Sequence, residues 1–224
     1  MITSSTSSTT VRLQPWGKHE CTPRCILDAA ASDAQWGILF SHPKDFTPVC
    51  TTELAFAASI SDKFTMRKVK MIALSVDSVE DHNVWIKDVM ALNNSSAALP
   101  FPIIADSGRK LATLLGMMDP DETDREGNPV TARCVFVIGP DKKLKLSCLY
   151  PATTGRNFDE LLRVIDSLQL TAQKKVATPV HWRPGDKVMV LPNIADDEVT
   201  KLFPNGVSTK EVPSRKKYLR YTQL

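Results

Sequence analysis

Short apolar runs alternate with amphipathic stretches along most of this chain. Runs rich in apolar and β-branched residues predict strands at residues 36–40, 69–76, 100–106, 134–138 and 143–149. Apolar residues at helical spacing predict helices from residue 49 onward and at 79–92, 109–115 and 158–168. Strands that alternate with helices indicate an α/β layered fold. A short turn joins the last two strands, which predicts a hairpin and therefore a mixed sheet flanked by helices.

The C-terminal part of the chain has a different composition. Prolines interrupt it at Pro179, Pro184, Pro192, Pro204 and Pro213. We therefore expect a main domain at 11–171 and a small appended domain at 172–224. Residues 1–10 contain eight Ser or Thr and no charged side chain, which is typical of a disordered tail.

Charge and composition argue against several classes of protein. Lys+Arg exceed Asp+Glu by 28 − 25 = 3, too few for the dense basic face of a dedicated nucleic-acid binder. We expect no stable membrane insertion, because no apolar run approaches the roughly 20 residues that span a bilayer. No apolar segment near the start is typical of a secretory signal. Five cysteines without a regular spacing fit thiols that stay reduced, which predicts a cytoplasmic protein.

The most informative segment is the extended stretch from Pro43 to Cys50, which leads into a predicted helix. Its cysteine falls in the first helical turn, where unpaired backbone N–H groups and the helix dipole favour a thiolate over a thiol. A free thiol with a pKa near 8.5 is about 3% ionised at pH 7, so full ionisation adds at most ~30-fold in rate. A fast nucleophile therefore needs further groups that hold the leaving oxygen in the transition state.

Neighbouring residues can supply such groups. The Thr47 hydroxyl can face the sulfur or a substrate oxygen, and Pro43 can shield the pocket from water. Arg133 begins an apolar strand, and a guanidinium there would stabilise the thiolate and donate to a peroxide oxygen. Considered alone, Cys50 also fits a small buried apolar residue, the commonest fate of a free cysteine.

The pattern Pro-x3-Thr-x2-Cys in this segment resembles the peroxidatic motif of the peroxiredoxins. Further strings resemble the one-Cys, peroxiredoxin-6-type branch of that family: SHPKDFTPVCTTE at 41–53, LSVDSVEDH at 74–82, PVTAR at 129–133, GPDKKLKL at 139–146 and YPATTGRNF at 150–158. The resemblance extends from about Trp36 to Leu224 and so covers most of the chain.

This resemblance implies a thioredoxin-like fold and the thiol-dependent reduction of hydrogen peroxide and organic hydroperoxides. By position, Cys50 is the peroxidatic cysteine, which attacks the O–O bond and becomes a sulfenic acid. Thr47 and Arg133 organise the peroxide, and Pro43 forms a wall of the pocket. The family also implies a homodimer in which residues 172–224 exchange contacts between subunits.

Three further residues gain a role only through the resemblance. His42 matches the pocket histidine of this branch. Glu53 and Arg156 match residues that hold Arg133 in place. Taken alone, Glu53 also fits a solvated acid at a helix start, and Arg156 also fits a surface arginine after a turn.

The other cysteines decide how the sulfenic acid is reduced. No cysteine follows Cys148, which argues against the C-terminal resolving cysteine of two-Cys relatives. Cys134 and Cys148 lie in predicted strands and are expected to be inert. Cys21 and Cys25 form a C-x3-C pair near His19, which leaves a redox pair open but does not fit a zinc site. We expect no metal, no cofactor and a one-Cys cycle with an external thiol reductant, from glutathione or the thioredoxin system.

Two features depart from the family. Its opening turn and hairpin are not evident in residues 1–35. Some members of this branch also hydrolyse phospholipids, but the serine position here is Gln35, the histidine position is Ala29, and only Asp141 remains. An amide offers neither a nucleophilic hydroxyl nor a proton to relay, so we expect no phospholipid hydrolysis by that route.

Two other functions fit parts of the sequence. The same fold without catalysis would serve as a holdase or a redox-relay protein, although Thr47, Cys50 and Arg133 together favour the peroxidase. A basic C-terminal tail would bind lipid or simply form a solvated face. This tail contains Lys210, Arg215, Lys216, Lys217 and Arg220.

Overall fold

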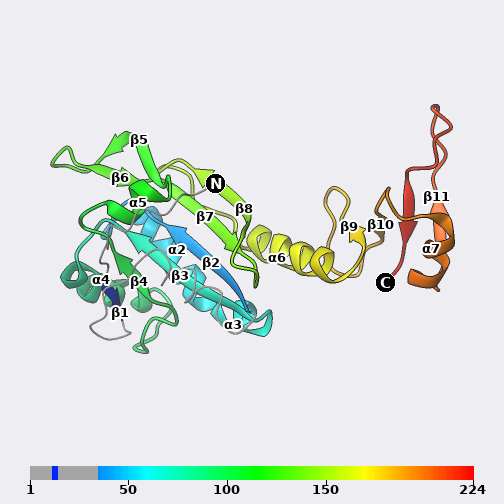
Figure 1. Cartoon of the computed structure of the whole chain (residues 1–224). Coiled ribbons are helices and arrows are strands. Elements are labelled where there is room, and N and C mark those ends of the chain that lie inside the picture. The colour runs from blue at the N-terminus through cyan, green and yellow to red at the C-terminus, as the bar shows by residue number, and fades with distance from the viewer. Residues whose placement is uncertain (1–11, 15–34) are drawn as a thin grey trace. The chain divides into compact units, whose positions relative to one another are not determined.

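The computed structural model of the protein describes residues 12–14 and 35–224 and contains two compact units, Met1–Arg156 and Asn157–Leu224 (Figure 1). The expected disordered tail at 1–10 lies outside the described residues. The division between the units falls just before the long helix α6, Phe158–Gln173, whereas the sequence predicts a boundary at 172. This helix groups with the second unit because its Leu170 packs against the small core of that unit.

The first unit is built around a six-stranded sheet with the strand order β1-β4-β3-β2-β7-β8 (Figure 1). Strands β2, β3 and β4 are parallel, whereas β1 runs antiparallel to β4 and β7 runs antiparallel to β2 and β8. The strands are β1 Arg12–Gln14, β2 Trp36–Ser41, β3 Val69–Ser75, β4 Ile103–Ala105, β7 Arg133–Ile138 and β8 Leu144–Tyr150. The predicted mixed sheet and its hairpin are confirmed.

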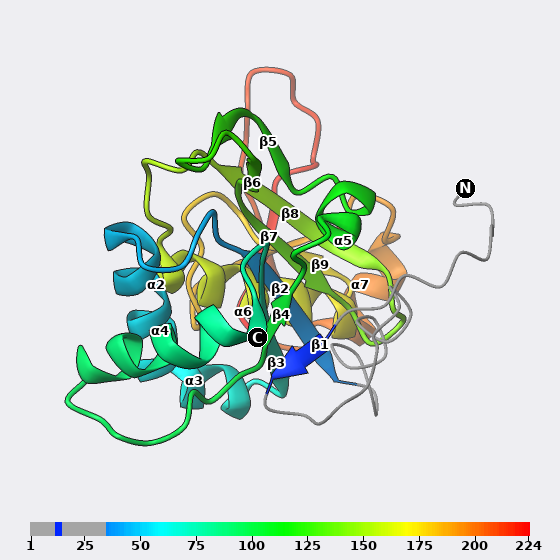
Figure 2. The ribbon, with the colours of Figure 1, turned by 90° about the vertical axis from the view of Figure 1, so that its left-hand side faces the viewer.

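Helices cover both faces of this sheet, with α2 and α4 on one side and α5 on the other (Figure 2). The helices are α2 Pro48–Ser59, α3 Ser61–Met66, α4 Val79–Ala91 and α5 Lys110–Leu114. The helical stretch expected from residue 49 is interrupted at Ile60, whose φ of −112° and ψ of 13° are not helical. Helix α5 ends just before Gly116, as predicted, because a φ of +66° suits glycine after a helix.

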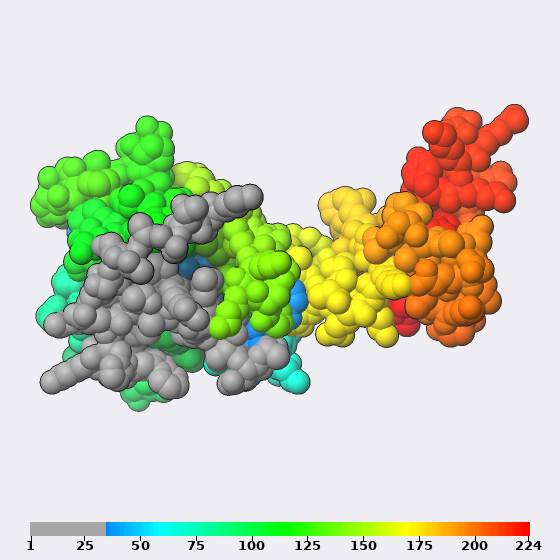
Figure 3. Space-filling model, viewed as in Figure 1, coloured from blue at the N-terminus to red at the C-terminus, as the bar shows by residue number. Residues whose placement is uncertain are grey.

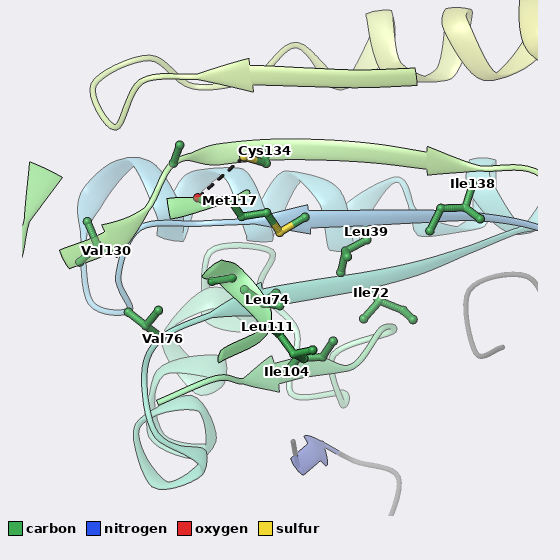
Figure 4. Close-up of a cluster of buried hydrophobic side chains, with 12 residues drawn as sticks. Leu39, Ile72, Leu74, Val76, Ile104, Leu111, Met117, Val130, Cys134 and Ile138 are labelled. Carbon is green, nitrogen blue, oxygen red and sulfur yellow. Dashed lines mark hydrogen bonds between the residues drawn. The ribbon is translucent and has the colours of Figure 1, made fainter. Parts of the chain in front are cut away.

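The core on the α5 side of the sheet joins three neighbouring strands to that helix. Leu39, Leu74 and Ile104 pack with Leu111 of α5 in one cluster (Figure 4). Each of these side chains is at most 1% exposed. Burial of a side chain of this size stabilises the fold by about 1.5–3 kcal/mol, so this cluster holds the sheet that carries the site.

A two-stranded hairpin includes residues 119–129, whose sequence is acidic and rich in turn-forming residues. Strands β5 Met118–Thr123 and β6 Pro129–Thr131 pair antiparallel with a shift in register. In Figure 3 this hairpin is the green lobe at the surface of the first unit. Most β5 side chains are exposed or half-buried, so the apolar alternation that reveals a strand in a sequence is missing.

The second unit has a small core of its own. It contains the helices α6 Phe158–Gln173 and α7 Asp196–Leu202 and the strands β9 Val176–Ala177, β10 Val188–Val190, β11 Val207–Thr209 and β12 Arg220–Thr222. The strands form an antiparallel sheet in the order β11-β12-β10-β9, beside a cluster that includes Trp182 and Phe203. Among the described residues, no helix has the length and apolar character needed to cross a membrane.

Candidate active site

Cys50 lies in the first turn of α2, as the sequence predicts. Thr47 is the N-cap of this helix and has an extended backbone, with φ −114° and ψ 147°. Pro48 follows as the first helical residue, where its fixed φ suits the helix and its missing N–H costs nothing. The sulfur of Cys50 is therefore near the positive end of the helix dipole, which favours a thiolate.

Arg133, the first residue of β7, brings its guanidinium to this sulfur. Nη1 of Arg133 lies 3.3 Å from Sγ of Cys50. Nε and Nη2 donate to the carbonyl of Ala152 at 3.0 Å and 2.6 Å. Arg133 is only 2% exposed, so water screens its positive charge little and the charge stabilises a thiolate. The structure thus brings together two residues that the sequence places in one site.

Glu53, one turn after Cys50 on α2, binds two buried guanidinium groups. Its Oε2 accepts from Nη1 of Arg133 at 2.7 Å and from Nη2 of Arg156 at 2.8 Å. Its Oε1 accepts from the backbone N of Arg156 at 2.6 Å and from Nε at 2.9 Å. Burial raises the pKa of Glu53, but the hydrogen bonds and charge of Arg156 outweigh burial and lower it. An ionised Glu53 therefore fixes the orientation of Arg133.

Arg156 is a buried support of the site and not a surface arginine. Its Nη1 donates to the carbonyls of Ser41 at 2.8 Å and Cys134 at 3.0 Å. Its guanidinium carbon lies 5.5 Å from the ring centroid of Phe40, a cation–π contact. Arg156 thus ties the end of β2, the start of β7 and helix α2 together. Its partner Glu53 is 5% exposed, so the alternative of a solvated acid is also wrong.

Thr47 and Pro43 lie in the loop between β2 and α2. Pro43 is buried and Thr47 is half-buried. The Thr47 hydroxyl donates to the carbonyl of Lys44 at 2.9 Å, so its oxygen keeps lone pairs that can accept from a hydroperoxide. Cys50 itself is 0% exposed. A hydroperoxide therefore reaches the sulfur only when side chains of this loop or of the first helical turn move.

His42 belongs to a second buried cluster next to this loop. Its Nε2 lies 2.7 Å from Oδ1 of Asp45, and Nδ1 of His82 lies 2.5 Å from Oδ2 of the same carboxylate. The ring of His42 also lies against Trp85, with centroids 5.0 Å apart. The resemblance assigns His42 to the peroxide pocket, and the structure gives it Asp45 as its hydrogen-bond partner.

Two carboxylates share this second cluster. Burial raises the pKa of Asp45, but the hydrogen bonds from the two histidines lower it to about 2. Burial raises the pKa of Asp77, and the negative charge of Asp45 raises it further. Ligand atoms of His42, Asp45 and Asp77 lie within 4.8 Å of one another, close enough to hold a cation. Both oxygens of Asp45 are engaged with histidine nitrogens, however, so we treat the group as a hydrogen-bond cluster.

Sequence reasoning misses Asp45, Asp77 and His82 as site residues. Asp45 lies inside the Pro-x3-Thr-x2-Cys pattern, at a position that the pattern leaves unspecified. His82 shares one face of α4 with Trp85 and Val89, at the spacing i, i+3, i+7 of a buried helix face. A histidine on an apolar face was the available signal, because a buried imidazole needs a polar partner.

The remaining described cysteines differ in environment. Cys134 is 1% exposed in the core of Figure 4, and burial raises the pKa of its thiol. Cys148 is half-buried on β8 opposite Val135, so its side chain lies on the same sheet face as Arg133. Both carry thiols and not a disulfide. Cys21 and Cys25 lie outside the described residues.

We expect the purified protein to release no fatty acid from phospholipid vesicles in the absence of calcium. Gln35 precedes β2 where a hydrolase serine would be needed, and the Asp141 carboxylate is bound to Lys145 at 2.7 Å. Ala29 lies outside the described residues. The assay uses labelled phosphatidylcholine and protein whose Cys50 has been alkylated. Hydrolysis that persists after alkylation would contradict the expectation.

Comparisons with known proteins agree with this geometry. Residues 24–147 match the AhpC/TSA family, and residues 167–206 match the C-terminal domain of 1-Cys peroxiredoxin. The chain is 68% identical over 189 residues to peroxiredoxin-6 of Gallus gallus, and 69% identical over 189 residues to peroxiredoxin-6 of Homo sapiens. Each alignment covers 84% of this chain and 84% of the relative.

Two solved structures are similar as well. A cysteine-to-serine mutant of the peroxiredoxin 6 of Arenicola marina has a TM-score of 0.82 and 60% identity, over 85% of this chain and 86% of that one. A yeast mitochondrial 1-Cys peroxiredoxin has a TM-score of 0.76 and 44% identity, over 85% of this chain and 87% of that one. With its thioredoxin-like fold and with Cys50 beside Arg133, the chain belongs to the peroxiredoxin family and is a thiol-dependent peroxidase of the one-Cys type.

Proposed function

We propose that the protein reduces hydrogen peroxide and organic hydroperoxides with Cys50 as the nucleophile. The thiolate attacks the peroxide oxygen that carries hydrogen, and an S–O bond forms as the O–O bond breaks. The sulfur is oxidised by two electrons to a sulfenic acid. The other oxygen leaves with the electron pair and takes up a proton, which gives water or an alcohol.

The observation that carries this proposal is the 3.3 Å contact between Nη1 of Arg133 and the sulfur of Cys50. Glu53 and the carbonyl of Ala152 already bind the guanidinium, so it needs no reorganisation when charge moves from the sulfur to the leaving oxygen. Thr47 supplies an acceptor for the peroxide O–H, and Pro43 keeps water from the reacting atoms.

An external thiol, from glutathione or the thioredoxin system, returns the sulfenic acid to the thiol. A first thiol forms a mixed disulfide with Cys50 and releases water, and a second thiol displaces Cys50 from that disulfide. The similar yeast protein, which has a thiol resolving mechanism via glutathione/thioredoxin systems, supports this route. The core position of Cys134 supports a cycle without an internal disulfide at that residue.

Peptide mapping after one equivalent of hydrogen peroxide tests both the reactive residue and the resolving route. We expect a sulfenic-acid trap such as dimedone to label Cys50. Excess peroxide should carry the residue to the sulfinic form, because in the proposed cycle the sulfenic acid waits for an external thiol. A disulfide from Cys50 to Cys148, Cys134, Cys21 or Cys25 would replace the one-Cys cycle with a two-Cys cycle. Labelling of another cysteine by dimedone would overturn the assignment of Cys50 as the nucleophile.

We also propose that the protein is a cytoplasmic homodimer. The thiols of Cys50, Cys134 and Cys148 support a reducing compartment. Val180 of the second unit is 83% exposed and is available for a contact between subunits. Sedimentation at micromolar concentration should give about twice the chain mass of 24.8 kDa. A stable monomer at that concentration would count against the dimer.

A further inference from the structure

A second buried hydrogen-bond network lies beside the loop between β2 and α2, and it has no part in the reaction steps proposed for Cys50. Asp45 is at its centre and accepts one hydrogen bond on each carboxylate oxygen. The bond from Nε2 of His42 measures 2.7 Å, and the bond from Nδ1 of His82 measures 2.5 Å. All three side chains are 0% exposed. The bridge therefore joins the loop before α2 to the first turn of α4, out of contact with bulk solvent.

This geometry fixes the proton on each ring. An ionised carboxylate only accepts hydrogen bonds, so His42 carries a proton on Nε2 and His82 carries one on Nδ1. Nδ1 of His42 and Nε2 of His82 are buried and have no hydrogen-bond partner among the described residues. A second proton on either ring would bury an unpaired N–H donor, which is costly. Each ring therefore donates to Asp45 through one defined nitrogen.

The loop that Asp45 anchors has a strained backbone. Phe46, the next residue, has a φ of +56°, in the left-handed region that a bulky residue rarely adopts. Its side chain is 53% exposed, so packing of the phenyl ring does not account for the conformation. The left-handed conformation is held instead through the neighbouring Asp45. The side chain of Asp45 accepts hydrogen bonds from the two histidines, and its backbone N–H donates to Asp77 at 2.9 Å.

The strained turn sets the direction of Thr47. The Thr47 hydroxyl donates to the carbonyl of Lys44 at 2.9 Å, across Asp45 and Phe46, and Thr47 then begins α2. If Asp45 lost a histidine partner, the turn would relax and the hydroxyl that meets the hydroperoxide would move. A displacement of about 1 Å in a positioned group can cost roughly 100-fold in rate.

We infer that His82 and Asp45 are positioning residues for the peroxidase reaction. The bridge His82–Asp45–His42 holds the left-handed turn at Phe46 and, through it, the Thr47 hydroxyl. Neither His82 nor Asp45 needs to touch the hydroperoxide. The effect on rate rests on the proposed function, whereas the proton positions on the two rings do not depend on it.

Three substitutions separate the hydrogen bonds from side-chain volume. His82→Asn keeps an N–H close to the position of Nδ1–H, whereas His82→Leu removes the donor. Asp45→Asn exchanges one acceptor oxygen for an NH2 group, so that one ring must move its proton to its other nitrogen. His181→Asn changes an exposed histidine of the second unit and is the matched control.

We expect His82→Leu and Asp45→Asn to slow the oxidation of Cys50 by hydrogen peroxide roughly 10- to 100-fold in stopped-flow experiments. His82→Asn and His181→Asn should stay near the native rate. Nitrogen-15 NMR can resolve the ring protons, because the chain has only four histidines. The native protein should show a proton on Nε2 of His42 and on Nδ1 of His82, and Asp45→Asn should change one of them.

The inference is wrong if the folded His82→Leu and Asp45→Asn proteins react at the native rate. It is also wrong if His42 of the native protein carries its proton on Nδ1. Variants with a lower melting temperature but an unchanged rate of Cys50 oxidation would contradict it as well. Should His82→Leu fail to fold, Asp45→Asn and His82→Asn decide, because both place a polar side chain in the cluster and only His82→Asn keeps the donor to Asp45. A native protein that consumes no peroxide would overturn the proposed function, and the ring protons would still test the bridge.

Discussion

Replacing Cys50 with serine is expected to abolish hydroperoxide consumption and leave the fold intact. A serine hydroxyl stays protonated at neutral pH and cannot form a sulfenic acid, so the reaction loses its nucleophile. The exchange removes little volume at a position that is 0% exposed. Nη1 of Arg133, now 3.3 Å from the sulfur, can donate to the new hydroxyl, so no buried charge loses all its partners.

The measurement is thiol-coupled consumption of hydrogen peroxide, with thermal unfolding recorded on the same preparation. Cys148→Ser is the matched control, because Cys148 lies on the sheet face of Arg133 and also carries a thiol. We expect the control to keep the native rate. Consumption by Cys50→Ser above that of the unfolded protein would point to a different nucleophilic thiol.

Local patterns predicted the elements that are buried on both faces. β3 reads as one apolar run because parallel strands flank it on both sides and helices cover both faces, and nearly all of its residues are buried. The exposed β5–β6 hairpin carries no such pattern, and the sequence did not predict its strands. The helical pattern after residue 49 continues across Ile60, but the backbone turns there, and spacing alone did not reveal the break.

For the site as well, residues could be predicted where a local pattern marks them, whereas contacts between residues far apart in the sequence could not. Cys50 and Thr47 could be predicted because one short segment contains both, and Arg133 because a charge in an apolar strand needs a partner. Spacing could not predict that Glu53 binds Arg156, which is 103 residues away in the sequence. The resemblance indicated only that both residues hold Arg133 in place. The apolar face of α4 signals that His82 needs a buried polar partner, but no spacing indicates that the partner is Asp45, 37 residues away, because this depends on how α4 packs on the loop.

Replacing Arg133 with alanine is expected to slow the oxidation of Cys50 by roughly 100-fold or more, which corresponds to about 2.7 kcal/mol of transition-state stabilisation. The substitution removes both the cation beside the sulfur and a donor for the leaving oxygen. Glu53 keeps hydrogen bonds from the backbone and side chain of Arg156, so its carboxylate does not become an unpaired buried charge. The fold should therefore survive, which thermal unfolding can check.

Arg133→Lys separates the charge from the planar fork of the guanidinium. A lysine ammonium can pair with Glu53 or approach the sulfur, but it cannot hold Glu53, the sulfur and the carbonyl of Ala152 in one rigid plane. We expect its rate to fall between those of the native protein and Arg133→Ala, measured by stopped flow at several peroxide concentrations. An unchanged rate in Arg133→Ala would mean that the helix dipole and Thr47 suffice to activate Cys50, and that the guanidinium beside the sulfur only supports the structure.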